Sequence, residues 1–290
     1  MFCFADATGE TLAALLRPGN AGANTVADHL DVLDAAVAQL PGEVATGHRT
    51  GDNPDLVERT LVVRAASARC TEGFLSACRA RNIGFFVSAR SNAQVRAAMF
   101  DAIGVEEAWL PARTQDGEEK AGAAAAELTC LIDGRNLPQG TRLIVRREPL
   151  HPGAHRSLSP SLDFRYWGFS TDQDGDPVGL DVTMRAHAHV EQHTARLKYS
   201  GLTRFPFTSF EANATWLMAV APSADLVRWF QLCCMNKPWR DARPKALRWA
   251  VFHAPGRLVH TARRRIVRSI DGWPTTEVLL GAYRRIELLA

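Results

Sequence analysis

Long apolar runs and secretion signals are missing from this sequence of 290 residues. No stretch reaches the ~18 uncharged apolar residues of a membrane span, and the best candidate, 214–221, is far shorter. The opening residues, 1–6, carry no basic run ahead of an apolar segment, as a secretory signal would. We therefore expect neither a membrane-spanning nor a secreted protein.

Cysteine pairs with the spacing of a metal site are also missing. None of the six cysteines belongs to a CxxC motif, and Cys233 and Cys234 are adjacent in an apolar stretch. Zinc sites and disulfide frameworks both depend on recurrent cysteine spacings. We expect buried thiols in a cytoplasmic protein, in preference to disulfides or a zinc site.

Lysine is scarce and positive charge is unevenly distributed, with four lysines beside 30 arginines. Residues 237–290 contain 12 Lys and Arg against 4 Asp and Glu, a balance of +8, whereas residues 1–236 contain 22 against 27, a balance of −5. A basic C-terminal quarter indicates a surface that faces a polyanion, and arginine grips phosphate bidentately. A coding bias towards arginine explains the composition equally well.

The hydrophobic periodicity of the first third predicts alternating strands and helices. Residues 2–5 and 11–16 predict the two strands of a hairpin. A helix is predicted next, from apolar residues at helical spacing: Val26, Leu30, Leu33, Val37 and Leu40. Two further strands, 61–65 and 83–87, enclose a helix that Thr71 caps. Because such crossovers are too long for hairpins, we expect an α/β layered sheet with a parallel part.

The rest of the chain predicts a β-rich segment followed by helices. A helical piece at 93–103 and a polar loop at 115–120 come first. Strand-like alternation then covers 128–147 and 164–182, on either side of a Pro/Ser-rich loop. Prolines separate the helices expected after residue 183, which span 184–199, 208–221, 224–235, 244–269 and 275–289.

Four side chains of metal-ligand type alternate in one short stretch: His187, His189, Glu191 and His193. A strand would place all four on one face, whereas a helix divides them into two pairs of i, i+4 neighbours. The flanking sequence favours a helix, which makes a three-histidine site unfavourable; a metal-dependent hydrolase using these residues is kept as an alternative. A helix aligns His187, Glu191 and Lys198, an arrangement suited to a hard metal ion or to phosphate chemistry. A solvated charged face would show the same pattern.

Arginines interleaved with apolar residues predict a basic amphipathic helix within 244–269. Its apolar face carries Trp249, Phe252 and Leu258. The basic residues around that face, suited to contact a nucleic-acid backbone, are Arg243, Lys245, Arg248, Arg257, Arg263, Arg264, Arg265 and Arg268. A surface helix held by salt bridges explains them equally well.

Other catalytic signatures are weak. His151 and His155 lie in a Pro/Gly loop, where a structural role is favoured over a catalytic one. The sequence contains no glycine-rich phosphate loop, no serine nucleophile elbow and no HExxH motif.

Short motifs follow one another in a specific order along nearly the whole chain: LRPGNA at 16–21, NT at 24–25, ADH at 27–29, VLD at 32–34, LVVR at 61–64, RRE at 146–148, HPGA at 151–154, VE at 190–191 with Lys198, GL at 201–202, PF at 206–207, Arg257, RR at 263–264 and WP at 273–274. In order and spacing they resemble the DDE transposases of bacterial insertion sequences, specifically insertion-sequence family 1380.

This resemblance implies an α/β fold with a ribonuclease H-like mixed sheet. Residues 1–114 and 183–235 would form the split core, 115–182 a β-rich insertion, and 236–290 a basic helical C-terminal region. The implied activity is cutting and rejoining of the element's double-stranded DNA ends, with two Asp and one Glu holding two Mg²⁺ ions. The implied protein partners are a second copy of the chain or a full-length transposase.

Only one of the three acidic metal ligands of the family has a matching residue in this sequence. Glu191 matches the metal-binding glutamate of the family, and Lys198 matches the lysine seven positions later. His187 stands where the family usually has arginine. Ala66 takes the place of the second aspartate, and Arg69 replaces a small residue near the same turn.

The first aspartate of the family lies on a central strand ahead of the hairpin, and we expect this chain, which opens with the hairpin at Phe2, to lack that strand. Metal affinity falls with each lost charged ligand. We therefore expect a truncated, catalytically inactive remnant of a transposase that still binds DNA. The alternative is a retained DNA-binding protein that occupies transposon ends and inhibits a full-length transposase.

Overall fold

The computed structural model describes residues 1–22, 25–58, 60–90, 92–150, 164–270 and 272–289. Residue contacts divide the chain into two compact units. We call Arg17–Ala188 the sheet unit, and Met1–Leu16 together with His189–Ala290 the helical unit. None of the helices described is both long enough and apolar enough to cross a membrane.

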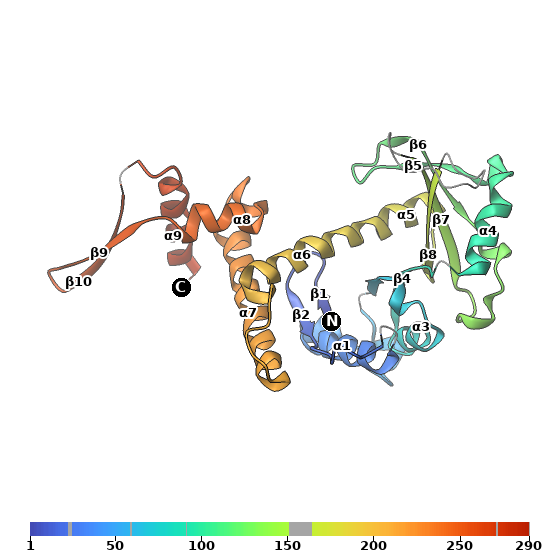
Figure 1. Ribbon diagram of the computed structural model, residues 1–290, viewed down its shortest axis with the longest axis horizontal. Helices are drawn as coiled ribbons and strands as arrows, with labels where there is room; N and C mark the ends of the chain where they lie inside the picture. The colour runs from blue at the N-terminus through green and yellow to red at the C-terminus, as the bar shows by residue number, and fades with distance from the viewer. Residues whose placement is uncertain (23–24, 59, 91, 151–163, 271, 290) are drawn as a thin grey trace. The chain divides into compact units, whose positions relative to one another are not determined.

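A six-stranded mixed sheet is the centre of the sheet unit (Figure 1). Its strands lie in the order β3-β4-β8-β7-β6-β5; β3 is parallel to β4, and each later neighbour is antiparallel. The strands are β3 (Leu61–Ala65), β4 (Ile83–Ser88), β5 (Leu110–Arg113), β6 (Glu119–Glu127), β7 (Arg142–Pro149) and β8 (Phe164–Thr171). The expected α/β sheet with a parallel part is confirmed.

Helices and short turns connect these strands. The α-helices of the sheet unit are α1 (Val26–Ala38), α2 (Gly42–Ala45), α3 (Glu72–Arg79), α4 (Ala93–Ile103) and α5 (Pro177–Arg185). Its 3-10 turns are η1 (Pro54–Leu56), η2 (Ser67–Arg69), η3 (Glu106–Ala108), η4 (Thr129–Leu131), η5 (Gly134–Asn136) and η6 (Ala186–Ala188). The cap expected at Thr71 is confirmed, because its side chain accepts a hydrogen bond from the backbone N–H of Phe74.

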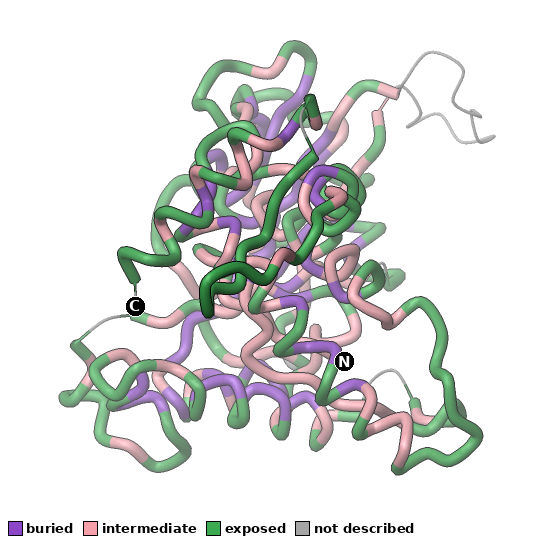
Figure 2. The backbone as a smooth tube through the Cα atoms, turned by 90° about the vertical axis from the view of Figure 1, so that its left-hand side faces the viewer, coloured by how far each residue is buried: buried purple, intermediate pink, exposed green. Residues whose placement is uncertain are grey.

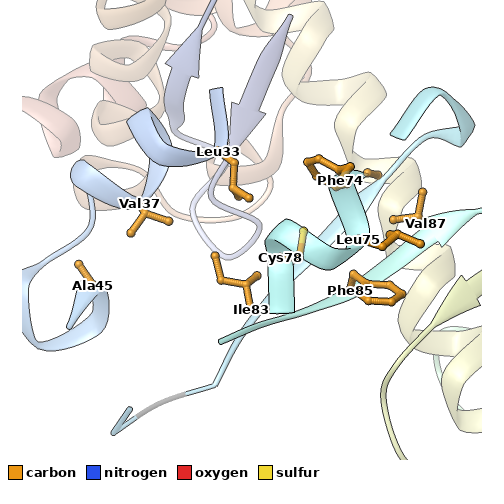
Figure 3. Close-up of a cluster of buried hydrophobic side chains, with 10 residues drawn as sticks. Leu33, Val37, Ala45, Phe74, Leu75, Cys78, Ile83, Phe85 and Val87 are labelled. Atoms are coloured by element: carbon orange, nitrogen blue, oxygen red, sulfur yellow. The ribbon is translucent and has the colours of Figure 1, made fainter. Parts of the chain in front are cut away.

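An apolar core fills the space between α1, α3 and β4, as Figure 3 shows. Its main side chains are Leu33, Val37, Phe74, Leu75, Cys78, Ile83, Phe85 and Val87. Because successive strand residues point to opposite faces, Phe86 instead joins Leu180 and Met184 of α5 on the other face of the sheet. Each buried Leu, Val, Ile or Phe side chain among them stabilises the fold by about 1.5–3 kcal/mol. Strand β4 is thus covered on both faces.

The strands after β4 continue the same sheet. β8 pairs directly with β4, with Phe86 opposite Thr171. The Thr171 hydroxyl also donates a hydrogen bond of 2.8 Å to the carbonyl of Phe85. The segment therefore extends the β3–β4 pair in one hydrogen-bonded sheet.

Two expected strand boundaries in this segment are wrong. The strand expected over 128–147 is displaced, since β6 ends at residue 127 and β7 begins at residue 142. The strand expected over 164–182 ends at Thr171. Asp176 then accepts hydrogen bonds from two backbone N–H groups and starts α5, with Pro177 at the first helical position, where its missing N–H costs nothing.

The helical unit contains two separate β-hairpins around one long helix. Its elements are β1 (Phe2–Phe4), β2 (Thr11–Ala14), α6 (His189–Leu197), the π-helical turn η7 (Lys198–Leu202), α7 (Phe210–Cys234), η8 (Trp239–Asp241), α8 (Pro244–Leu247), the π-helical turn η9 (Arg248–Phe252), β9 (Gly256–Thr261), β10 (Arg264–Ser269) and α9 (Thr276–Leu289). The β1–β2 hairpin expected from the sequence is confirmed. It is tied to α7 by a 2.9 Å hydrogen bond from the N–H of Thr11 to Asp225.

The long helix α7 runs through Pro222, so the break expected there is wrong. Proline removes the hydrogen bond to the carbonyl four residues earlier, which is that of Met218. Met218 is 64% exposed, so water can satisfy that carbonyl. The helix continues to Cys234 without a second start.

The helix expected over 244–269 is also wrong in its second half. Helical structure ends at Phe252, and residues 256–269 form the antiparallel β9–β10 hairpin. Pro255 and Gly256 interrupt the helix, and Ala262 and Arg263 both adopt positive φ in the turn. Two consecutive positive φ angles are typical of the tight turn of a β-hairpin.

None of the six cysteines forms a disulfide. Cys78 and Cys234 are buried, but Cys130 and Cys233 are exposed, so the expectation of uniformly buried thiols is wrong. Adjacent positions on a helix point about 100° apart, so Cys233 and Cys234 have opposite environments. Figure 2 shows the same alternation of buried and exposed positions along the backbone.

Candidate functional site

The carboxyl end of β3 is the position at which the resemblance places a catalytic aspartate. β3 and β4 are parallel, so their carboxyl ends share one edge of the sheet, where open α/β sheets bind ligands. Ala66 follows β3 and precedes the turn η2. Arg90 donates long hydrogen bonds of 3.4 Å to the carbonyls of Ser67 and Ala68. The methyl side chain of Ala66 supplies no metal-binding oxygen here.

Glu191 and Lys198 lie on one helical stretch of the helical unit. Glu191 is in the first turn of α6, and Lys198 begins η7; both are exposed. Seven residues correspond to about 10.5 Å along a helix axis, so the two do not pair. Glu191 forms no ion pair with any residue that the structure describes. Its carboxylate therefore faces solvent.

His187 lies in the sheet unit, on the turn η6 that follows α5. It lines a cavity of about 300 Å³, whose other walls are Arg146, Glu148, Arg165, Trp167, Met184, Arg185 and Ala188. The family resemblance groups three residues, His187, Glu191 and Lys198, and the structure distributes them over two units. His187 belongs to the sheet unit, and Glu191 and Lys198 belong to the helical unit.

A buried ion pair lies beside this cavity. The Arg146 guanidinium donates from Nη1 to Oδ2 of Asp181 at 2.5 Å, and Asp181 is fully buried. Arg146 also donates from Nε to Oε1 of Glu148 at 2.6 Å, and Lys120 reaches the same oxygen at 2.8 Å. Arg185, one turn after Asp181, places its Nε 3.4 Å from Oδ2. The network joins β7 to α5.

Burial and charge oppose each other in this network. Burial raises the pKa of Asp181, and the positive charges of Arg146 and Arg185 act against that rise. Burial also acts to raise the pKa of Glu148, but hydrogen bonds from Lys120 and Arg146 outweigh it and hold that pKa below its ordinary value. The two carboxylates therefore lie among an excess of positive charge, since three cations surround them: Arg146, Arg185 and Lys120.

The family motif RRE contains Arg146 and Glu148, but the sequence analysis does not identify Asp181 or its contacts with them. Asp181 lay within a stretch misassigned to a strand. The Asp176-Pro177 helix start was the available signal, since it places Asp181 one turn into a helix that packs on the sheet.

His193, part of the alternating histidine motif, is a core residue of the helical unit. It is 7% exposed, its Nδ1 accepts a 3.0 Å hydrogen bond from Arg196, and its ring lies 5.3 Å from that of Phe4. Burial and the nearby Arg196 lower the pKa of His193 to about 4. Burial lowers the pKa of Arg196 to about 10, and Arg228 adds to the effect. Neutral His193 is therefore a hydrogen-bonded packing residue, while His189 is exposed.

The acidic side chains do not assemble the metal site that the resemblance implies. Among the described residues, no three His, Cys, Asp or Glu side chains gather closely enough to hold an ion. A two-metal phosphoryl-transfer centre needs several carboxylate oxygens. Ala66 contributes none, and Glu191 contributes a single exposed carboxylate. The residues present do not fit a Mg²⁺ pair.

The basic C-terminal residues lie on two structures instead of one helix. Arg243, Lys245 and Arg248 lie at or beside α8. The hairpin carries the others, which are Arg257 on β9, Arg263 in the turn, and Arg264, Arg265 and Arg268 on β10. All eight are exposed, as phosphate contact requires. His151 and His155, the loop histidines, lie outside the described residues.

The fold is that of a ribonuclease H-like α/β protein. It has a mixed sheet with one parallel pair of strands and helices on both faces, and the helix that carries Glu191 follows a β-rich segment. The whole chain, residues 1–290, matches the model of the family described as transposase DDE domain group 1, and the chain belongs to this family. Membership supports a role in DNA transposition. No curated protein matches the chain.

Proposed function

We propose that this chain is an insertion-sequence transposase, of insertion-sequence family 1380, that retains DNA binding and has lost strand cleavage. Ala66 at the carboxyl edge of the parallel strands is the observation that supports the loss. In this proposal residues 1–114 and 183–235 derive from the catalytic core, 115–182 from its β-rich insertion, and 236–290 from a DNA-contacting region.

The chemistry follows from the donor set. In-line displacement at a phosphodiester by two metal ions requires carboxylates that hold both ions against the attacking and leaving oxygens. Alanine at position 66 removes one ligand outright, and Glu191 is exposed with no neighbouring carboxylate cluster among the residues described. The proposed loss of strand cleavage follows from this incomplete set of metal ligands.

Metal binding and cleavage are measured separately. We expect the unmodified chain to retain no stoichiometric Mn²⁺ after dialysis, by electron paramagnetic resonance, and to leave a duplex carrying the element's ends uncut in Mg²⁺. Nicking that the Glu191→Gln variant abolishes would overturn the proposal. Nicking that Glu191→Gln leaves unchanged identifies a contaminating nuclease, and the Mn²⁺ measurement then decides.

A second function is favoured by the eight exposed basic residues. In this alternative the chain occupies the transposon ends and inhibits a full-length transposase. Fluorescence anisotropy should show tighter, salt-dependent binding to a terminal-repeat duplex than to a shuffled duplex of the same composition. Equal binding to both duplexes removes the alternative, and inhibition of a full-length relative by added chain supports it.

The proposed setting is the cytoplasm, with a second copy or a full-length transposase as protein partner. The exposed Cys130 and Cys233 form no disulfide, which suits a reducing compartment. Cell fractionation tests the location. Sedimentation velocity, with and without DNA, tests the association of two copies.

A further inference from the structure

β9 and β10 form a two-stranded ribbon whose residues are exposed on both faces. Six cross-strand pairs run from Gly256 opposite Ser269 to Arg264 opposite Thr261. Within the helical unit the ribbon extends away from α8 and α9 (Figure 1). Every residue from 256 to 269 is exposed except Val259, which is half-buried.

One face of the ribbon is strongly basic. Side chains that oppose each other across antiparallel strands share a face, and successive side chains alternate between faces. The register therefore gathers one set, which we call the arginine face: Arg257, Val259, Thr261, Arg264, Ile266 and Arg268. The opposite face carries a smaller charge, with Arg265 and His260 beside Leu258 and Val267.

Within the described part of the chain, no ion pair neutralises the charge of the ribbon. Residues 256–269 contain five arginines and no carboxylate. Arg257 lies directly opposite Arg268, and like charges in opposed positions destabilise a sheet. Neither arginine forms an ion pair with any other residue that the structure describes. A polyanion on this face would relieve the repulsion.

We infer that the β9–β10 ribbon enters the major groove of duplex DNA with its arginine face towards the DNA, an inference that rests on the proposed DNA-binding function. The major groove is about 12 Å wide and admits a two-stranded ribbon, whereas the minor groove is about 6 Å wide. Six residue pairs at about 3.3 Å each give a ribbon about 20 Å long, enough to follow the groove over several base pairs.

The two kinds of side chain on the arginine face have different partners in the groove. Arg257, Arg264 and Arg268 stand at the two ends of the face, where guanidinium groups can meet phosphates or the O6 and N7 atoms of guanine. Val259 and Ile266 form its apolar middle, and apolar side chains contact thymine methyl groups in the major groove.

A second copy of this chain is the rival occupant. Its ribbon would carry the same five arginines, so two arginine faces would repel each other, whereas DNA supplies opposite charge along the whole length. Charge therefore favours DNA over self-association.

The test uses the full chain and fluorescence anisotropy with a terminal-repeat duplex at several KCl concentrations. We expect Arg257→Gln/Arg264→Gln/Arg268→Gln to weaken binding at least tenfold and to reduce the slope of log affinity against log salt by about two to three. The control is Arg49→Gln/Arg113→Gln/Arg204→Gln, which removes the same charge from exposed positions outside residues 236–290; it should stay within about twofold of the unmodified chain. Circular dichroism checks that both variants fold.

Groove ligands test the mode of entry. Methyl green, which occupies the major groove, should displace the chain, and netropsin, which occupies the minor groove, should not. Displacement by netropsin alone would overturn the inference. So would a concentration-dependent dimer that Ile266→Glu dissociates while DNA affinity stays unchanged.

Different results would contradict the ribbon assignment and the proposed DNA binding. If the unmodified chain binds no duplex at all, the proposed DNA binding fails and the inference fails with it. If the chain binds DNA but the arginine-face variant binds like its charge-matched control, only the ribbon assignment is overturned.

Discussion

Arg146 and Asp181 join a central strand to a covering helix by charge: Nη1 of Arg146 lies 2.5 Å from Oδ2 of Asp181, and both side chains are buried. β7 provides the arginine and α5 the aspartate. A buried pair of this kind contributes little net stability compared with apolar packing, but loss of one partner leaves an unpaired buried charge. The pair therefore fixes how α5 lies on the sheet.

Removal of the aspartate should be strongly destabilising. We expect Asp181→Ala to lower the free energy of unfolding of the sheet unit by about 3 kcal/mol, because Arg146 keeps only Glu148 as a partner. Lys120→Ala, which removes a partly exposed member of the same network, should cost less than about 1 kcal/mol. Urea denaturation at pH 7 measures both. Equal losses for the two variants would contradict the role given to the buried pair.

The buried His193 should make the helical unit sensitive to acid. Burial and the neighbouring Arg196 lower its pKa from an ordinary 6.5 to about 4, so between these values the unfolded chain binds a proton that the folded chain does not. Stability is then fully present above about pH 6.5 and is lost as pH falls. The loss between pH 7 and pH 5 should be about 2 kcal/mol.

Asparagine can accept the Arg196 hydrogen bond without titrating. The stability of His193→Asn should therefore change much less than that of the unmodified chain between pH 7 and pH 5, by urea denaturation. His189→Asn, on the exposed side of the same helix, should keep the unmodified pH dependence. An unchanged acid loss in His193→Asn would refute the assignment.

Gly9 should tolerate no side chain. Its φ is +78°, and an added Cβ would lie 2.6 Å from Arg196 Nη1 and 2.7 Å from His193 Cε1. Gly272, with φ +81°, has open space around it. Gly272→Ala thus reports backbone strain alone, and we expect Gly9→Ala to cost about 1–3 kcal/mol more, by thermal or urea unfolding. Similar losses would mean that the close approach has no energetic effect.

The turn of the β9–β10 ribbon should respond to its residue at position 262. Ala262 has φ +43°, a conformation that asparagine tolerates and β-branched residues resist. Ala262→Asn should increase hydrogen-exchange protection of the ribbon amides, and Ala262→Val should decrease it. No difference between the two would argue against the tight turn. Neither variant alters the charge of the ribbon.

The first part of the fold follows from local pattern. The helix α1 and the Thr71 cap of α3 lie where periodicity and capping chemistry place them. There, local preference and tertiary packing favour the same conformation. The parallel pairing of β3 and β4 follows from the helix between them.

Other elements depend on contacts distant in sequence. Residues 121–126 are alanines and one glycine, a composition that favours helix over strand, yet they lie in β6 because that strand pairs with β7, with Ala126 opposite Val145. The β9–β10 hairpin did leave a local signal, the Pro255-Gly256 break. Apolar residues at helical spacing continue to Leu258, however, and this pattern predicts a helix across the break.

The candidate site divides in the same way. Family motifs identify Ala66, Glu191 and Lys198, because those matches are local. The Arg146–Asp181 pair joins residues 35 positions apart, and no pattern in the sequence couples them. The register of β9 with β10 likewise decides which arginines share a face.

The direct pairing of β8 with β4 determines which losses this fold survives. Excision of the β-rich stretch would strip β4 of the neighbour that meets it at Phe86–Ser88, leaving two short strands with open edges, an arrangement too small to persist in water. Replacement of one residue at the edge of the sheet, as at Ala66, leaves all the hydrogen bonds between β4 and β8 in place. Point mutations in such a gene can therefore remove catalytic residues one by one while the protein still folds, whereas an in-frame deletion of its middle would prevent folding.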